Sequence, residues 1–241
     1  GRLPMDVVSE MMGVPVADRE ELRRLSDLLV HREPGVHDVP PEGMAAALDL
    51  IVYYADMLAQ RRANPTDDLT SALLAAEIDG DRLTDDEITG FLFLMVVAGN
   101  ETTTKLLANA WYWAWRNPDE RAKPFADASY IPIWVEETLR YDTSSQMLAR
   151  ITTTDVEMYD GVIPAGDRDV LLAGSANRDP RVFSHPDRYD LDRPEPLAQL
   201  ASFGFGRHFC LGASLARLEA RVALEELVRA FDTYDIDPSG I

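Results

Sequence analysis

The sequence predicts a mainly helical protein with a minor β region. Apolar residues recur at helical spacing over residues 45–62, 131–140 and from 211 onward, and a longer helical run covers about 85–116. Short runs rich in valine, isoleucine and threonine, bounded by turn residues, lie between 148 and 173. Helices are therefore expected to form the body, and the strands one small region in the second half of the chain.

The composition is that of an ordinary globular protein and argues against several classes of partner. The chain has 241 residues, 46% hydrophobic and 27% charged, enough for one sizeable core. Its net charge of −19 disfavours nucleic acids and anionic membranes, which both attract basic surfaces. A single cysteine excludes an intrachain disulfide, and no signal peptide is visible, so we expect a cytoplasmic protein.

The first part of the chain reads as a series of helices. Asp18 stands ahead of a helical run and has Glu21 three residues later, the spacing of a capping box. Apolar periodicity then predicts a helix over about 45–62 and a short one over about 69–76.

The longest predicted helix starts at a second capping box, in which Thr84 precedes Glu87 by three residues. It continues to about Trp115, ahead of the helix-ending Pro118, a length of about 45 Å at about 1.5 Å per residue. Because residues 91–98 are apolar on every side of such a helix, we expect this part to be buried. The apolar run is too short for a membrane span.

A polar group follows directly in the same helix and contains Gly99, Glu101 and Thr102. Two interpretations are open. The group is either the polar face of a curved helix, or a local opening that holds a small ligand and water. In the second case a threonine hydroxyl can donate a proton to the ligand, and a neighbouring carboxylate can replace that proton.

The β region follows a predicted helix over 131–140. Residues 148–154 and 170–173 read as strands, and a hairpin lies between them over 156–163. Asp160-Gly161 is the signal for a type I′ turn at the hairpin tip.

The only cysteine, Cys210, lies in a glycine-rich decapeptide over 203–212. Leu211, Leu215, Leu218 and Val222 then form an apolar stripe, which places Cys210 at the start of a helix. A helix N-terminus stabilises a thiolate, the form that ligates metals and attacks electrophiles. A buried free cysteine, a nucleophile paired with His208 and an iron ligand all remain open, whereas zinc would need further ligands.

These motifs together resemble those of the cytochrome P450 monooxygenases. The decapeptide resembles their haem-binding loop, F-G-x-G-x-H-x-C-x-G, at Phe203, Gly204, Gly206, His208, Cys210 and Gly212. The long helix is similar to their oxygen-activating motif, [AG]-G-x-[DE]-T-[TS], at Ala98, Gly99, Glu101, Thr102 and Thr103. Glu137 and Arg140 match the family's buried E-x-x-R pair, which alone would read as a surface ion pair.

The resemblance implies a cytochrome P450 fold, truncated at the N-terminus and at the extreme C-terminus, so that the chain is the C-terminal portion of the haem domain. We expect a single partial domain over 1–241. Its helical part is 1–128, a helix and the small β region fill 129–200, and the cysteine loop with its helix occupies 201–241.

The resemblance also assigns residues to a site that holds haem b, iron protoporphyrin IX. Cys210 would ligate the iron, and Thr102 with Glu101 would deliver protons. Further cofactor contacts are implied for His208, Arg150, Phe203, Gly204, Gly212, Ala98 and Gly99. The structural triad would be Glu137, Arg140 and Arg188, and the substrate pocket would include Leu94, Val97, Gln146 and Met147.

The implied activity is that of a soluble bacterial monooxygenase that inserts one oxygen atom of O₂ into a small hydrophobic substrate. A ferredoxin or flavodoxin would supply electrons, and Arg207, Arg217 and Arg221 are candidates for a basic docking patch. Two other readings stay open: a cofactor-free fragment that acts as a structural or binding module, and an enzyme that uses Cys210 as a nucleophile.

Overall fold

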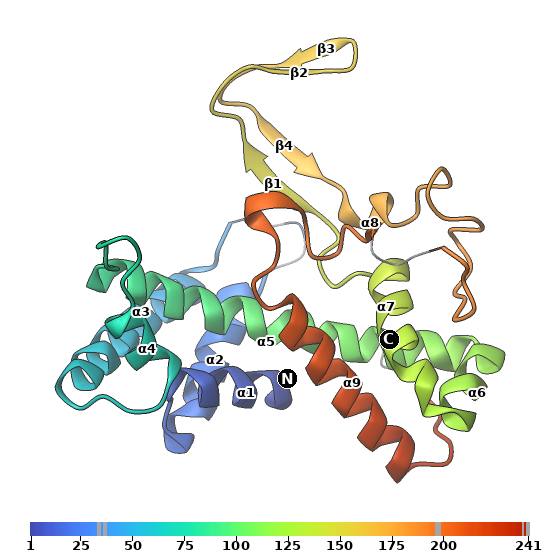
Figure 1. Ribbon diagram of the computed structural model, residues 1–241, viewed down its shortest axis with the longest axis horizontal. Coiled ribbons are helices and arrows are strands. Elements are labelled where there is room, and N and C mark those ends of the chain that lie inside the picture. The colour runs from blue at the N-terminus through green and yellow to red at the C-terminus, as the bar shows by residue number, and fades with distance from the viewer. Residues whose placement is uncertain (33–34, 36–37, 196–198, 238, 240–241) are drawn as a thin grey trace. The chain divides into compact units, whose positions relative to one another are not determined.

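The structure, a computed structural model, describes residues 1–32, 35, 38–195, 199–237 and 239. It divides into two compact units, residues 1–104 and 105–241. Both units are mainly helical, and the long helix α5 (Asp85–Arg116) supplies residues to each of them (Figure 1). Each unit has its own buried cluster of apolar side chains.

Unit 1 contains α1 (Arg2–Met12), α2 (Arg19–Val30), α3 (Pro41–Ala63), α4 (Leu69–Ala75) and the first part of α5. Its core forms because each helix has one apolar stripe, such as Leu50, Tyr54 and Met57 on α3, all almost fully buried. Gly99 lets α1 approach α5 closely, since a Cβ at this position would lie 2.7 Å from Cγ2 of Val8.

The two predicted capping boxes have different outcomes. At the start of α5 the Thr84 N–H donates to Oε2 of Glu87 (2.8 Å) and the Glu87 N–H donates to Oγ1 of Thr84 (3.3 Å). This box is confirmed, and its hydrogen bonds lower the pKa of Glu87. Asp18 does not cap α2, because its carboxylate accepts the Tyr53 hydroxyl (2.8 Å) instead.

The sequence predicted that the apolar part of α5 would be buried on every side. In the structure only part of its surface is buried. Leu92 and Val96 are fully buried, whereas Leu94 is 60% exposed and Ala98 is also exposed. The prediction was wrong because hydrophobicity alone does not say how many neighbours a helix has. No helix in the described ranges combines the length and the apolar character that crossing a membrane requires.

Unit 2 contains the end of α5, α6 (Pro118–Ala126), α7 (Ile131–Tyr141), α8 (Ala173–Ala176) and α9 (Ala213–Ala230). α9 buries Ala213, Ala220 and Leu224. The predicted stripe on this helix points outward instead, with Leu218 48% and Val222 44% exposed. Ala213 and Ala220 on the buried face are small, which allows close contact between neighbouring helices.

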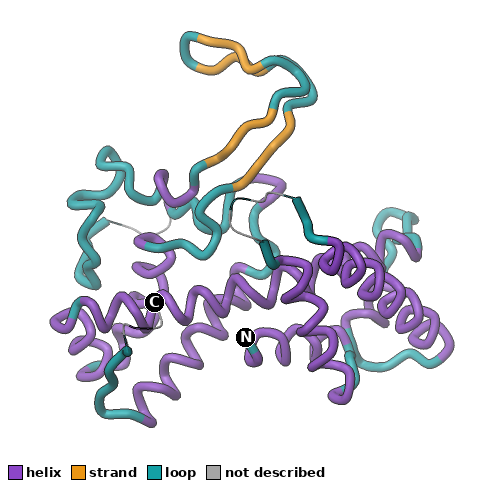
Figure 2. Tube along the Cα trace, turned by 180° about the vertical axis from the view of Figure 1, so that it is seen from behind, coloured by secondary structure: helices purple, strands orange, loops and turns teal. Residues whose placement is uncertain are grey.

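The β region of unit 2 consists of two antiparallel ribbons. β1 (Leu148–Ile151) pairs with β4 (Arg168–Leu171), and β2 (Val156–Met158) pairs with β3 (Gly161–Ile163). The β2–β3 hairpin prolongs the β1–β4 ribbon (Figures 1 and 2). The tip residues are Tyr159 and Asp160, one position earlier than predicted, and Tyr159 takes the left-handed φ of 52°.

Candidate functional site

The cysteine loop of unit 2 is held by its own backbone and leaves its thiol exposed. The Cys210 N–H donates to the Phe203 carbonyl (2.8 Å), which closes the loop. Gly204 and Gly206 have φ values of 69° and 64°, a region that favours glycine. α9 begins at Ala213, whose N–H donates to the Cys210 carbonyl (3.2 Å), so the cysteine lies just ahead of the helix.

The surroundings of Cys210 suit a large apolar ligand that binds through sulfur. Phe205, Phe209 and Leu211 are 67%, 54% and 76% exposed on this short loop. An exposed cysteine with apolar neighbours matches the protein side of a haem–thiolate bond, so the residues present fit haem. Within the described ranges no hydrogen bond joins His208 to Cys210, and a nucleophilic dyad therefore lacks its required contact.

Arg217 of α9 ties the cysteine loop to α7. Its guanidinium carbon lies 4.5 Å from the centroid of the Phe203 ring, and its Nη2 donates to Oε2 of Glu136 (3.1 Å). Arg221 pairs in turn with Glu225 at 3.5 Å. Two of the three arginines expected to form a docking patch are thus paired with carboxylates, and the structure does not support a patch of unopposed positive charge.

A buried ion network stabilises the segment that follows α8. Glu137 and Arg140 are fully buried, and both guanidinium–carboxylate bonds measure 2.7 Å. The second arginine on Glu137 is Arg193, at 3.2 Å and 3% exposed. The prediction of Arg188 was wrong: its side chain is 64% exposed and lies 3.6 Å from Asp190.

Arg188 contributes to this network through its backbone. Its carbonyl accepts hydrogen bonds from Arg140 (2.9 Å) and Arg193 (2.8 Å). The backbone of Arg188 directs its carbonyl toward the two guanidinium groups, and its exposed side chain lies outside the network. Sequence spacing cannot distinguish these two orientations in an irregular segment.

The predicted proton-delivery residues lie in unit 1, on a stretch of α5 that is continuous helix. The Thr102 hydroxyl donates to the Ala98 carbonyl (2.7 Å), and the Thr104 hydroxyl donates to the Asn100 carbonyl (2.9 Å). The local opening of the helix that the sequence suggested is absent from this described stretch. Glu101 and Thr102 are both half-buried.

One face of α5 carries several of the predicted site residues. Leu94, Ala98 and Thr102 are spaced by four residues and therefore share this face. Val97 is partly buried and packs against the core of unit 1, so it is less suited to the predicted pocket wall than Leu94. The glycine at position 99 is explained by packing, because the Val8 side chain leaves no room for a Cβ there.

The remaining predicted residues follow α7 in unit 2. Gln146 is exposed, and its Nε2 donates to Asp142 (2.9 Å) and to the Thr143 carbonyl (2.8 Å). Met147 is 62% exposed. Arg150, on β1, is half-buried and donates from Nη1 to the Ala149 carbonyl (2.8 Å).

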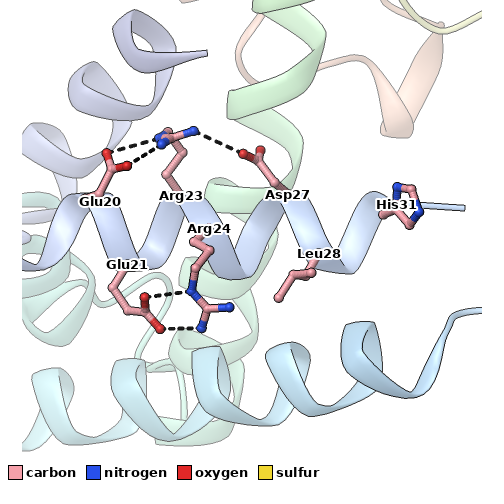
Figure 3. A pocket seen from close by; sticks show the side chains of 7 residues that line it. All are labelled: Glu20, Glu21, Arg23, Arg24, Asp27, Leu28 and His31. Atoms are coloured by element: carbon pink, nitrogen blue, oxygen red, sulfur yellow. Dashed lines mark hydrogen bonds and ion pairs between the residues drawn. The ribbon is translucent and has the colours of Figure 1, made fainter.

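A groove of about 350 Å³ on unit 1 contains none of the predicted site residues (Figure 3). Side chains of α2 line it, and its charges are paired: Arg24 donates to Glu21 (2.6 Å), and Arg23 bonds to Glu20 and to Asp27. These bonds lower the pKa values of Glu20 and Glu21. We therefore assign no site to this groove.

Comparison with known proteins identifies the family. The model of the family "Cytochrome P450" matches residues 46–238. The chain is 60% identical to a putative cytochrome P450 123 of Mycobacterium tuberculosis over 241 residues, which is all of this chain and 60% of that protein. It is 38% identical to the cyclomarin C epoxidase CymV of Salinispora arenicola, over 97% of this chain and 60% of that protein.

Solved structures agree with this assignment. Bacillus megaterium CYP109E1 in complex with corticosterone has a TM-score of 0.88 and 37% identity, over 98% of this chain and 64% of that chain. The chain belongs to the cytochrome P450 family, and its mainly helical fold is that of the family. It spans about 60% of the length of the curated relatives quoted above.

Proposed function

We propose that the chain provides the cysteine loop and the oxygen-side helix of a haem-thiolate monooxygenase. The observation that carries this proposal is the loop around Cys210, where an exposed thiol lies among apolar side chains and two glycines with left-handed φ. Membership of the family supports it. The reaction is the insertion of one oxygen atom of O₂ into a substrate.

The cofactor we propose is haem b. When bound, it supplies the activation of O₂, and a thiolate ligand favours O–O cleavage. Cys210 would hold the iron through Sγ, while Phe205, Phe209 and Leu211 would exclude water from the bond. His208 is exposed on the loop and Arg150 half-buried on β1, and we propose that both bind the haem propionates.

The role proposed for α5 is to hold and transfer protons. The Thr102 hydroxyl donates to the Ala98 carbonyl in this structure, and a hydroxyl oxygen is an acceptor as well as a donor. Rotation of the hydroxyl would direct its O–H toward a ligand on the exposed face of the helix, to which it would pass its proton. Glu101, the adjacent residue, would return that proton from solvent. Leu94 and Ala98 would keep the same face apolar.

The substrate proposed is a small hydrophobic molecule. Leu94 in unit 1 and Met147 in unit 2 are exposed apolar side chains, and the family resemblance implies a place for each in the substrate pocket. One relative is named as an epoxidase of cyclomarin C, and one structural neighbour contains corticosterone. Hydroxylation or epoxidation of an apolar carbon framework is consistent with both.

We propose that electrons come from a separate redox protein. One cysteine cannot hold an iron–sulfur cluster, which takes four thiolates. We therefore propose a ferredoxin or flavodoxin as the donor, in a reducing compartment such as the cytoplasm.

Alkylation of the single cysteine tests the haem assignment. Iodoacetamide should modify Cys210 rapidly in the haem-free chain, and stoichiometric haem should slow this at least about tenfold, because a thiolate that ligates iron is not free to react. Mass spectrometry reports the modified fraction without interference from other thiols. Equal alkylation rates with and without haem would favour a cofactor-free module. Catalytic turnover without haem would favour an enzyme that uses Cys210 as a nucleophile.

A further inference from the structure

Asn177, which the sequence analysis missed, is a fully buried residue at the end of α8. Its Nδ2 donates to the Ser202 hydroxyl (2.8 Å) and to the Leu139 carbonyl (3.2 Å). Its Oδ1 accepts the Ala201 N–H (2.7 Å). The side chain thus connects the end of α7 to the residues just ahead of the cysteine loop.

The backbone of Asn177 is equally engaged. Its carbonyl accepts from Nη1 of Arg140 (3.2 Å), and its N–H donates to the Ala173 carbonyl (3.0 Å). Every donor and acceptor group of the residue has a partner, as a fully buried amide requires. Ser202 completes the junction, because its hydroxyl also donates to the Leu139 carbonyl (2.7 Å).

A short series of hydrogen bonds continues from this junction to Cys210. The Ala201 carbonyl accepts the Gly204 N–H (2.9 Å), and the Phe203 carbonyl accepts the Cys210 N–H (2.8 Å). The peptide held by Asn177 therefore lies two residues from the carbonyl that closes the cysteine loop. On its other side Asn177 contacts Arg140, a member of the buried ion network.

We propose that Asn177 is a positioning residue for the cysteine loop. It fixes Ala201 and Ser202 against the end of α7, and through them it sets the position from which the Cys210 thiol is presented. The hydrogen bonds alone carry this role in the loop. The effect on the bond between the Cys210 sulfur and haem iron rests on the function proposed above.

The amide is suited to this junction for a chemical reason. The junction presents two acceptors, the Leu139 carbonyl and the Ser202 hydroxyl oxygen, and one donor, the Ala201 N–H. Only an uncharged amide offers two N–H groups and an oxygen at this length. An aspartate would place a carboxylate against the Leu139 carbonyl. A leucine would remove all three side-chain bonds and leave the Ala201 N–H without its acceptor, although Ser202 and Leu139 would still bond to each other.

Hydrogen exchange on the complete chain tests the proposal without haem. In Asn177→Leu the amides of Ala201, Gly204 and Cys210 should exchange at least about tenfold faster than in the wild type, because the loop loses its attachment. Asn109→Leu is the matched control. It removes another asparagine of unit 2, which donates to the Asp142 carbonyl (2.9 Å), and should leave these three amides unchanged.

Ser202→Ala keeps the test decisive if Asn177→Leu does not fold. It removes the two bonds of the Ser202 hydroxyl but keeps the bond from the Ala201 N–H to Asn177, so it should accelerate the same amides by a smaller factor. Unchanged exchange in Ser202→Ala and in a folded Asn177→Leu would overturn the proposal. So would acceleration of equal size in Asn109→Leu, since that would show general loosening of unit 2.

A spectroscopic measurement extends the test to the iron–sulfur bond. In the reduced carbon monoxide complex of the haem-loaded chain, Asn177→Leu should lower the fraction with the red-shifted Soret band of thiolate ligation, and Asn109→Leu should not. An unchanged fraction would overturn the consequence for ligation. Failure of every variant and of the wild type to take up haem would overturn the proposed function, while the exchange result would still decide the positioning role.

Discussion

Glu137 and Arg193 form an ion pair at 3.2 Å in which the side chains are 0% and 3% exposed. Arg140 bonds to the same carboxylate with two bonds of 2.7 Å. One buried negative charge thus faces two positive charges. Arg193 also reaches the partly exposed Glu195 carboxylate at 3.5 Å, and the other N–H groups bond to backbone carbonyls, among them those of Ser184, Pro186 and Arg188. The network therefore fixes backbone, and this explains how an irregular segment is ordered in unit 2.

Because of this network, we expect the loss of Arg193 and the loss of Arg188 to lower stability by different amounts, although the two residues are close in sequence. Arg193→Ala should lower the free energy of unfolding by about 3 kcal/mol, because it breaks a buried pair and leaves carbonyls without donors. Arg188→Ala should change it by less than about 0.5 kcal/mol, since only an exposed side chain is lost. Urea denaturation of both variants checks the difference. Equal costs would contradict the assignment of Arg193.

We expect the effect of Gly99→Ala on stability to change sign when the Val8 side chain is shortened. Gly99→Ala should destabilise the chain by about 1–2 kcal/mol, because its Cβ would lie 2.7 Å from the Val8 side chain. In a Val8→Ala background the same change should stabilise by about 0.5–1 kcal/mol, the helix preference of alanine over glycine. A double-mutant cycle from thermal unfolding measures this coupling. A coupling of zero would refute the packing role of Gly99.

Glu219 of α9 predicts a pH dependence of stability. The residue is 8% exposed, its Oε2 lacks a hydrogen-bond partner within the described ranges, and burial raises the pKa to about 7. The folded state therefore holds the proton more tightly than the unfolded chain, whose reference value is 4.5. The protonated Glu219 carboxyl therefore contributes fully to the stability of the folded state below pH 4.5, and this contribution is lost as the pH rises toward 7.

We expect the wild type to lose about 2 kcal/mol more than Glu219→Gln over this interval. Urea midpoints measured at several pH values for both proteins provide the comparison. Parallel profiles for the two proteins would show that Glu219 does not titrate in this interval.

Thr102 and Thr104 make the same intrahelical bond, so they form a matched pair for the proposed proton delivery. Both Thr102→Val and Thr104→Val should leave stability within about 0.5 kcal/mol, because each loses the same kind of bond to a carbonyl of its own helix. In the reaction of the whole protein, Thr102→Val should release more hydrogen peroxide per O₂ consumed, and Thr104→Val should not. Identical peroxide yields would remove Thr102 from the mechanism.

The sequence predicted those features that local chemistry determines. The cysteine loop depends on glycines that permit left-handed φ, and the capping box of α5 depends on two residues three apart. Both are encoded in a few neighbouring residues. The long helix predicted over about 85–116 likewise coincides with α5 (Asp85–Arg116), since its periodicity is sustained.

The features that sequence analysis missed depend on distant partners. The buried face of α9 contains two alanines and Glu219 and is less apolar than the outward stripe, so hydrophobicity indicated the wrong side. Arg193 could not be chosen over Arg188 because an irregular segment has no periodicity to orient its side chains. Asn177 gave no signal, because an asparagine at a helix end usually reads as part of a turn.

The central claim is that Cys210 ligates haem iron through a thiolate. The most direct measurement is the absorption spectrum of the reduced, carbon monoxide-bound, haem-loaded chain beside its Cys210→Ser variant. We expect the red-shifted Soret band of thiolate ligation in the wild type and its loss in the variant. The same band in both proteins, or its absence from a wild type that has bound haem, would show that Cys210 does not ligate the iron as a thiolate.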